Sequence, residues 1–172
     1  MPSADTASRL DNIHRSIDRF LQEKIETGLS ETIFYMFQHM PSNLTDSLTR
    51  WIVATVNDLG QIGPLRGAGS GQSGAMRALQ LDLNLYEKSD SSSLTQTSRY
   101  ALSTLATEVK ELFGSRSGGI KVYDYTDVAV PHVGLLRPSR FPTVIIRHDA
   151  ENIGIRQADV RVELTYVDVV ND

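Results

Sequence analysis

The stretch ALQLDLNLY, residues 78–86, decides the fold of this chain. Its leucines alternate strictly with other side chains, most of them polar. They occupy positions 79, 81, 83 and 85, with Gln80, Asp82, Asn84 and Tyr86 as the intervening and final residues. Because successive side chains of a strand point to opposite faces, the pattern predicts a strand with one buried and one wet face, as in an antiparallel sheet.

Two other segments have helical spacing. Residues 5–27 place apolar side chains at intervals of three and four, and Gly28 follows at a position where helices commonly end. Residues 97–113 repeat this pattern and are followed by Gly114. We therefore expect two main helices, packed on one face of the sheet.

Four further runs rich in β-branched residues predict strands: WIVATV at 51–56, IKVYDY at 120–125, TVIIRH at 143–148 and DVRVELTYV at 159–167. Residues 32–37 fit a buried strand or a buried helix turn equally well. Residues 57–60 have the composition of a turn, and the prolines within 127–142 predict a long irregular loop. We expect one α+β domain over residues 1–172, with a mostly antiparallel sheet of about five strands.

The segment GPLRGAGSGQSGAMR, residues 63–77, contains the spacing G-x-G-x-x-G at Gly69, Gly71 and Gly74. A dinucleotide site with this spacing needs a strand immediately before it and a helix that begins within it. Here the preceding strand is expected to end near Val56, and a strand follows. No Lys follows the glycines, so the P-loop form is also absent. We interpret residues 60–77 as a flexible Gly-rich loop and expect no cofactor.

No set of residues has the spacing of a catalytic or metal site. The histidines show neither H-x-x-x-H nor H-E-x-x-H spacing, and G-x-S-x-G is absent. Asp124, Asp127, His132 and His148 lie close in sequence and form the one candidate metal cluster, but such residues are more often ordinary loop and strand-end polar groups. We expect no catalytic residue, no metal and no enzymatic activity.

Composition limits the possible partners. The chain has 172 residues, no cysteine and a formal net charge of −4. Without cysteine it has no disulfide, thiolate nucleophile or Cys-based zinc site. No apolar run is long enough to predict a membrane span, and no secretory signal is visible. Its Lys and Arg residues form no basic stripe, so we expect no tight DNA-binding surface, although DNA could pass close by.

The order of these segments and their residue patterns resemble those of the tail terminator (tail completion) proteins of long-tailed bacteriophages. The resemblance extends from about Ser8 to Val167. It rests on six segments in this order: DNIHRSIDRFLQEKI, WIVATV, LQLDLNLYEKSD, YALSTLATEVKELF, IKVYDY and DVRVELTYV. Proteins of this family have an α+β fold and form a hexameric ring, which ends the growth of the tail tube and joins the tail to the head.

The resemblance implies a structural neck protein of the virion, made in the host cytoplasm, that forms a homo-hexamer. The implied partners are the tail tube protein, the head-side connector or stopper protein, and genomic DNA that passes through the lumen without specific binding, with the sheath as a further candidate. Subunit contacts are expected in or beside the two long loops. The candidate interface residues there are Arg66, Gly67, Gly69, Gly71, Arg77, Arg137 and Arg140.

Two alternatives stay open at this point. One is another tail or baseplate adaptor of similar fold. The other is a small nucleotide- or metal-dependent enzyme that uses the glycine loop or the region from Asp127 to His148. A six-fold ring in solution would favour the neck protein, whereas a stable monomer with ligand-dependent melting would favour the enzyme.

Overall fold

The computed structural model describes residues 9–35, 38, 47–64, 72–88, 96–114, 119–147 and 154–171. Helix α2 (Leu10–Leu21) continues into a π-helical segment, η1 (Gln22–Thr27), and helix α4 spans Gln96–Glu111. The strands, in chain order, are β1 (Ile33–Phe34), β2 (Arg50–Pro64), β3 (Gln72–Lys88), β4 (Ile120–Tyr123), β5 (His132–Pro138), β6 (Thr143–Arg147) and β7 (Ile155–Asn171).

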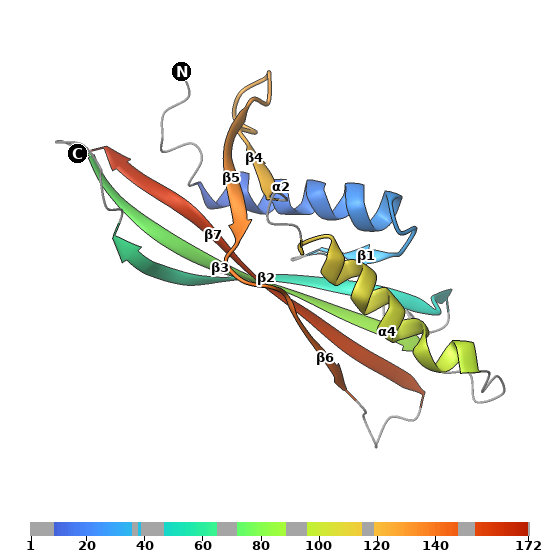
Figure 1. Ribbon diagram of the computed structural model, residues 1–172. Coiled ribbons are helices and arrows are strands. Elements are labelled where there is room, and N and C mark those ends of the chain that lie inside the picture. The colour runs from blue at the N-terminus through green and yellow to red at the C-terminus, as the bar shows by residue number, and fades with distance from the viewer. Residues whose placement is uncertain are drawn as a thin grey trace.

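Strand β3 lies in the centre of a seven-stranded sheet, between β2 and β7 (Figure 1). All 17 residues of β3 pair with β7 without a register shift, from Gln72 opposite Asn171 to Lys88 opposite Ile155. The outer edge of β7 pairs with β6 along residues 157–161 and with β5 at Leu164 and Thr165. Every pairing is antiparallel except that of β1 with β2.

The core is built on the leucine face of β3. Leu79, Leu81, Leu83 and Leu85 are all fully buried. They belong to one cluster with the inward-facing residues of β2 and β7 and with the apolar stripes of α2 and α4. The two helices also contact each other: the centre of the Phe20 ring in α2 lies 5.4 Å from the centre of the Phe113 ring, just after α4. The alternation read from residues 78–86 therefore sets the position of the hydrophobic core.

Buried polar contacts attach α2 to the end of β4. The backbone N–H of Tyr123 donates to Ser16 Oγ at 2.9 Å, and that of Tyr125 donates to Asn12 Oδ1 at 3.0 Å. Asn12 also donates from Nδ2 to Asp124 Oδ1 at 3.3 Å. Asn12 and Ser16 are 0% and 1% exposed, so water does not replace these bonds. They fix the chain direction where β4 ends.

The structure confirms the α+β class, the two main helices and the mostly antiparallel sheet. The expectation of about five strands is wrong, since the sheet has seven. One missed strand is β5, which lies inside residues 127–142, where we expected an irregular loop. Its Pro138 is the last residue of the strand, a position that needs no further ladder hydrogen bond. The ambiguous residues 32–37 contain the short strand β1.

The turn expected at residues 57–60 is a β-bulge inside β2. The register between β2 and β3 shifts between Asp58 and Gly60, and Gly60 has φ = +79°. The Gly60 N–H donates to Asp58 Oδ1 at 2.7 Å. Residues 60–64 and 72–77, expected as parts of a loop, are paired strand, and residues 65–71 lie outside the described ranges.

Gly28 follows the helical segment, as the spacing predicts, but it is not in the left-handed conformation. Its φ is −76°, and the nearby residue with positive φ is Ser30, at 57°. A Cβ at position 28 would lie only 2.4 Å from the carbonyl oxygen of Lys24. Glycine is required here for close approach to the backbone rather than for a positive φ.

We predict that Asn12→Ala lowers the free energy of unfolding by about 1–3 kcal/mol, because it removes a fully buried side chain and leaves the partly buried backbone N–H of Tyr125 without its acceptor. Urea unfolding of the variant beside the parent protein measures this. Gln22→Ala, at an exposed position of the following segment, is the control and should change stability by less than about 0.5 kcal/mol. Equal unfolding midpoints for the two variants would contradict the role given to Asn12.

Candidate functional site

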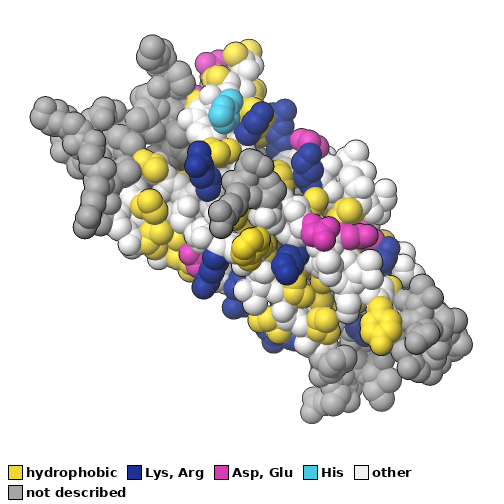
Figure 2. Space-filling model, viewed as in Figure 1, with side chains coloured by type: hydrophobic (Ala, Val, Ile, Leu, Met, Phe, Trp, Pro, Cys, Tyr) yellow, Lys and Arg dark blue, Asp and Glu magenta, His cyan; other side chains and the backbone are white. Residues whose placement is uncertain are grey.

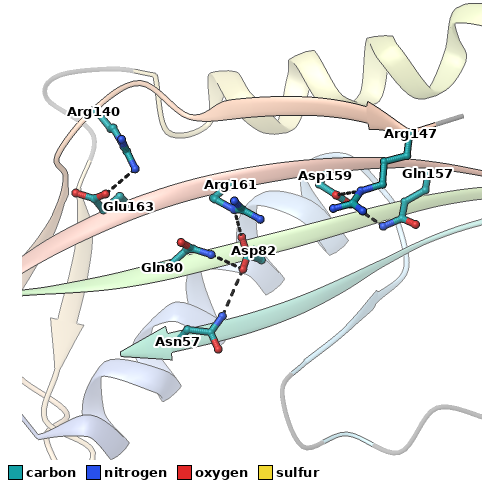
Figure 3. Close-up of polar contacts among 9 residues, drawn as sticks. All are labelled: Asn57, Gln80, Asp82, Arg140, Arg147, Gln157, Asp159, Arg161 and Glu163. Carbon is teal, nitrogen blue, oxygen red and sulfur yellow. Dashed lines mark hydrogen bonds and ion pairs between the residues drawn. The ribbon is translucent and has the colours of Figure 1, made fainter. Parts of the chain in front are cut away.

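A row of ion pairs lies on the face of the sheet opposite the leucines of β3 (Figure 3). Along β7, this face presents Asp159, Arg161 and Glu163, because every second residue points the same way. Each is paired with an oppositely charged side chain: Asp159 with Arg147 at 2.6 Å, Arg161 with Asp82 at 2.8 Å, and Glu163 with Arg140 at 2.8 Å. The signs of charge therefore alternate along the strand.

Asp82 joins the three central strands of this face. Its carboxylate accepts from Arg161 Nε of β7 at 2.8 Å, from Gln80 Nε2 of β3 at 2.7 Å and from Asn57 Nδ2 of β2 at 3.3 Å (Figure 3). Its side chain is only 18% exposed. Charge-assisted hydrogen bonds of this kind hold both partners in a fixed geometry.

The outer two pairs differ in burial. The Asp159 residue is 4% exposed and also accepts from Gln157 Nε2 at 2.7 Å. The Glu163 side chain is 24% exposed and also accepts from Ser139 Oγ at 2.6 Å. A buried carboxylate depends on its partners far more than a hydrated one does. The Arg147–Asp159 pair is therefore the more important of the two for stability.

The charge on this face is largely neutralised. Each of Arg140, Arg147 and Arg161 already has a carboxylate partner, which offsets its positive charge toward a phosphate. The row of ion pairs can hold strands in register, but it contains no nucleophile with an adjacent base. On the surface in view in Figure 2, which has the viewing direction of Figure 1, Lys and Arg side chains are likewise interspersed with acidic and hydrophobic ones.

A second surface is the end of the three-stranded ribbon that projects past both helices, next to the C-terminus (Figure 1). We define the ribbon end as residues 57–64, 72–77 and 166–171. Four of its large hydrophobic side chains are exposed: Leu59, Ile62, Met76 and Val167, at 47%, 51%, 39% and 43%. Met76 lies directly opposite Val167 in the register, so these two share one face.

The backbone edges of the ribbon end have no strand beside them among the described residues. Strand β1 covers β2 only at Ile52 and Val53, and β5 covers β7 no further than Thr165. Unpaired strand edges together with exposed apolar side chains are typical of surfaces that contact another chain.

The proposed metal residues do not gather into a site. Within the ranges that the structure describes, no group of three or more His, Asp or Glu side chains could hold a metal ion. The Asp124 carboxylate accepts from the Thr126 hydroxyl at 2.6 Å and from the Thr126 N–H at 2.9 Å. Asp127 accepts from the N–H of Ala129 in a turn, and the His132 ring lies against Tyr123. His148 lies outside the described ranges.

The G-x-G-x-x-G spacing does not lead into a helix. Gly74 is part of β3, which begins at Gln72, whereas Gly69 and Gly71 lie outside the described ranges. A pyrophosphate site of this type relies on the free N–H groups of a helix N-terminus. The strand after Gly71 offers none, in agreement with the interpretation of this segment as a connection between strands.

The candidate interface residues lie at separate places. Arg66, Gly67, Gly69 and Gly71 lie outside the described ranges. Arg77 lies on the ribbon end, 3.9 Å from Asp58, and Arg140 is paired with Glu163. Arg137 is exposed on β5 beside Thr165. Sequence reasoning missed the exposed apolar residues Ile62 and Met76, although both lie within the expected loop at residues 60–77. None of the helices in the described ranges has the length and apolarity of a membrane span.

We predict that Arg147→Ala destabilises the protein by about 1–3 kcal/mol, because it leaves the buried carboxylate of Asp159 with only the amide of Gln157. Arg140→Ala is the matched control, since Glu163 is partly hydrated and keeps Ser139, so the loss should be about 0–1 kcal/mol. Chemical unfolding of both variants measures the difference. If Arg140→Ala costs as much as Arg147→Ala, burial does not decide the importance of these pairs.

The pH dependence of stability tests the role of Asp124. Hydrogen bonds from Thr126, and a weaker one from Asn12, lower the pKa of the Asp124 carboxyl below its ordinary value of 3.8. The stabilisation by this group is therefore present above pH 3.8 and is lost as the pH falls through the lower pKa of the folded state. We expect the parent protein to be more stable than Asp124→Asn at neutral pH, with a difference that shrinks on acidification. A pH-independent difference would mean that the charge of Asp124 is not responsible.

Comparison with known proteins supports the fold alone. The sequence matches no protein-family model and no curated protein. A solved structure aligns with 91% of this chain and 94% of its own length, with a TM-score of 0.55 and 10% sequence identity. At this identity the likeness concerns the arrangement of helices and strands and carries no statement about function.

Proposed function

We propose that this protein is a structural component of the neck of a long-tailed bacteriophage. In this proposal six copies form a ring that caps the tail tube and joins the tail to the head-side connector. The protein performs no chemistry, and its function lies in the contacts between subunits and with the tube and connector proteins. Its site of action is the virion, after synthesis in the host cytoplasm.

The observation that carries the proposal is the ribbon end. Two unpaired strand edges and four exposed hydrophobic side chains lie together on a part of the sheet that no described helix covers. An isolated subunit would leave this apolar surface in water, which is unfavourable by about 25 cal/mol for each Å². A neighbouring chain that covers this apolar surface would remove it from water. A ring forms when such contacts are head-to-tail and close on themselves.

The ion-paired face offers further support. A channel that lets DNA pass should not grip the phosphate backbone, and each basic group that contacts phosphate adds to binding. Arg140, Arg147 and Arg161 are neutralised by carboxylates of the same subunit. We propose that this face is suited to the lumen, because its charges are already satisfied within the subunit.

The decisive test of the ring is the size and symmetry of the purified protein. We expect a mass of six subunits by native mass spectrometry or light scattering, and a six-fold ring with a central hole by electron microscopy. Mixing the protein with filled heads and with tails that lack it should increase the number of joined particles. A protein that stays monomeric at all concentrations and does not increase joining would refute the proposal.

We predict that Met76→Asp combined with Ile62→Asp abolishes ring formation and leaves the folded subunit intact, because both side chains are exposed on the ribbon end. The measurement is subunit mass by light scattering, with thermal unfolding as the check on folding. Ile146→Asp is the matched control, since it adds a charge at an exposed hydrophobic position of β6 outside the ribbon end and should assemble normally. Normal rings from the double variant would show that the ribbon end is not a subunit contact.

A further inference from the structure

The outer side of α2 carries two arginines whose guanidinium groups are stacked on tyrosines. The guanidinium carbon of Arg19 lies 4.4 Å from the centre of the Tyr123 ring, and that of Arg15 lies 5.8 Å from the centre of the Tyr125 ring. Both arginines are exposed and line an open hollow of about 560 Å³. The hollow is completed by Asp18, Gln22, Tyr35 and Tyr125.

Within the described ranges no carboxylate oxygen lies within 4.0 Å of either guanidinium group, although the charge of Arg19 acts on Glu23 over a longer distance. In this they differ from every other arginine whose side chain the structure describes, apart from Arg137, because each of the others has a carboxylate oxygen within 4.0 Å. A guanidinium that lies over an aromatic ring is held in place, and its N–H groups point outward in the plane of the guanidinium. Arg15 and Arg19 are therefore prepared to bind acidic groups.

Helix α4 carries the complementary set. Tyr100, Thr104, Glu108 and Glu111 are all exposed, and their spacing places them on one side of the helix. Tyr100 is 62% exposed. Neither Glu108 nor Glu111 has a basic group within 4.0 Å among the described residues. The carboxylate of Glu108 acts on the buried Glu31 of its own subunit, whose pKa is raised first by burial and further by this charge.

We infer that the acidic side of α4 in one copy docks on the arginine hollow of α2 in a neighbouring copy. This inference rests on the proposed ring, because it names one of the contacts that would close it. Arg15 and Arg19 are four residues apart, and Glu108 and Glu111 are three apart, so both pairs span about one helical turn, or roughly 5–6 Å. The two pairs can therefore meet side by side, with Tyr100 adding apolar area to the contact.

A second copy of this chain fits the hollow better than a nucleic acid does. The hollow contains the Asp18 carboxylate, and Glu23 and Glu26 lie on the next turn of the helical segment. A phosphate backbone presents continuous negative charge and would be repelled by these groups, whereas two carboxylates on a helix reach only the two arginines. The chain as a whole carries a net charge of −4, which also opposes binding to a polyanion.

Charge reversal tests the contact. We expect Arg15→Glu/Arg19→Glu to raise the protein concentration needed for half assembly by about tenfold or more, since like charges then face each other. Glu108→Arg/Glu111→Arg should do the same. The four substitutions together restore opposite charges across the contact and should recover assembly close to that of the parent protein. Light scattering or sedimentation over a dilution series gives these concentrations, and thermal unfolding checks each variant.

A smaller exchange guards against effects on folding near Glu31. The pair Arg19→Glu and Glu111→Arg leaves Arg15 and Glu108 in place. Each of these two single variants should raise the concentration needed for half assembly, and the variant with both changes should recover assembly. Arg9→Glu/Lys24→Glu is the matched control, because it makes the same change in net charge at exposed positions of the same helical segment outside the hollow. It should assemble as the parent protein does.

The outcomes separate this inference from the proposed function. If the parent protein forms rings and both charge reversals leave assembly unchanged, the α2–α4 contact is wrong and the ring proposal stands. Loss without recovery in the combined variant also overturns the contact, because the two sides then do not face each other. If the parent protein forms no oligomer, the ring proposal itself fails.

Discussion

The whole structure depends on the pairing of β3 with β2 and β7 over nearly the full length of these strands. A strand of 17 residues with an unbroken ladder to β7, and a ladder to β2 that shifts register at only two places, holds its side chains in a strict alternation. A slip of one residue would turn every buried leucine of β3 to the wet face and every polar residue to the core. The helices pack where the leucine face is continuous. The charged groups of the other face find their partners because the same register brings them together.

The ladder also determines what the two faces of the sheet present to their surroundings. Its length exceeds what two helices can cover, so part of the apolar surface of the sheet remains open to another chain. The polar face is occupied by cross-strand pairs, as in the contacts of Asp82 with three neighbours on three strands. Side chains that are fixed in this way maintain shape, and the described part of the chain holds no comparable group of reactive residues.

The sequence alone predicts those features that depend on local periodicity. The leucines at 79, 81, 83 and 85 predict the core face of β3, and the spacing in residues 97–113 predicts α4 within two residues at each end. It fails where a signal has two meanings. Asp58 and Gly60 are turn residues, but here a glycine with positive φ and an aspartate acceptor form a bulge within a strand. The three prolines within residues 127–142 predict a loop, but β5 tolerates them because it pairs with β7 at only two positions. The pairs of the polar face cannot be predicted, because Asp82 and Arg161 are 79 residues apart and meet only through the register of β3 and β7.

The attachment of β5 determines how this molecule can open. Strand β5 pairs with β7 at only two positions, Arg137 with Thr165 and Pro138 with Leu164, whereas β4 is held by α2 through Asn12 and Ser16. The β4–β5 hairpin and α2 are therefore joined to each other by hydrogen bonds, and they are held to the sheet mainly by side chains in the shared core, such as Ile17 and Leu136. Their separation from the sheet would break few ladder hydrogen bonds, although it would expose this part of the core. Their backbone amides should exchange with solvent at a lower free energy of opening than those of the central ladder. In the ring that we propose, a subunit with such a hierarchy would adjust its helical side to a partner while its sheet keeps its shape.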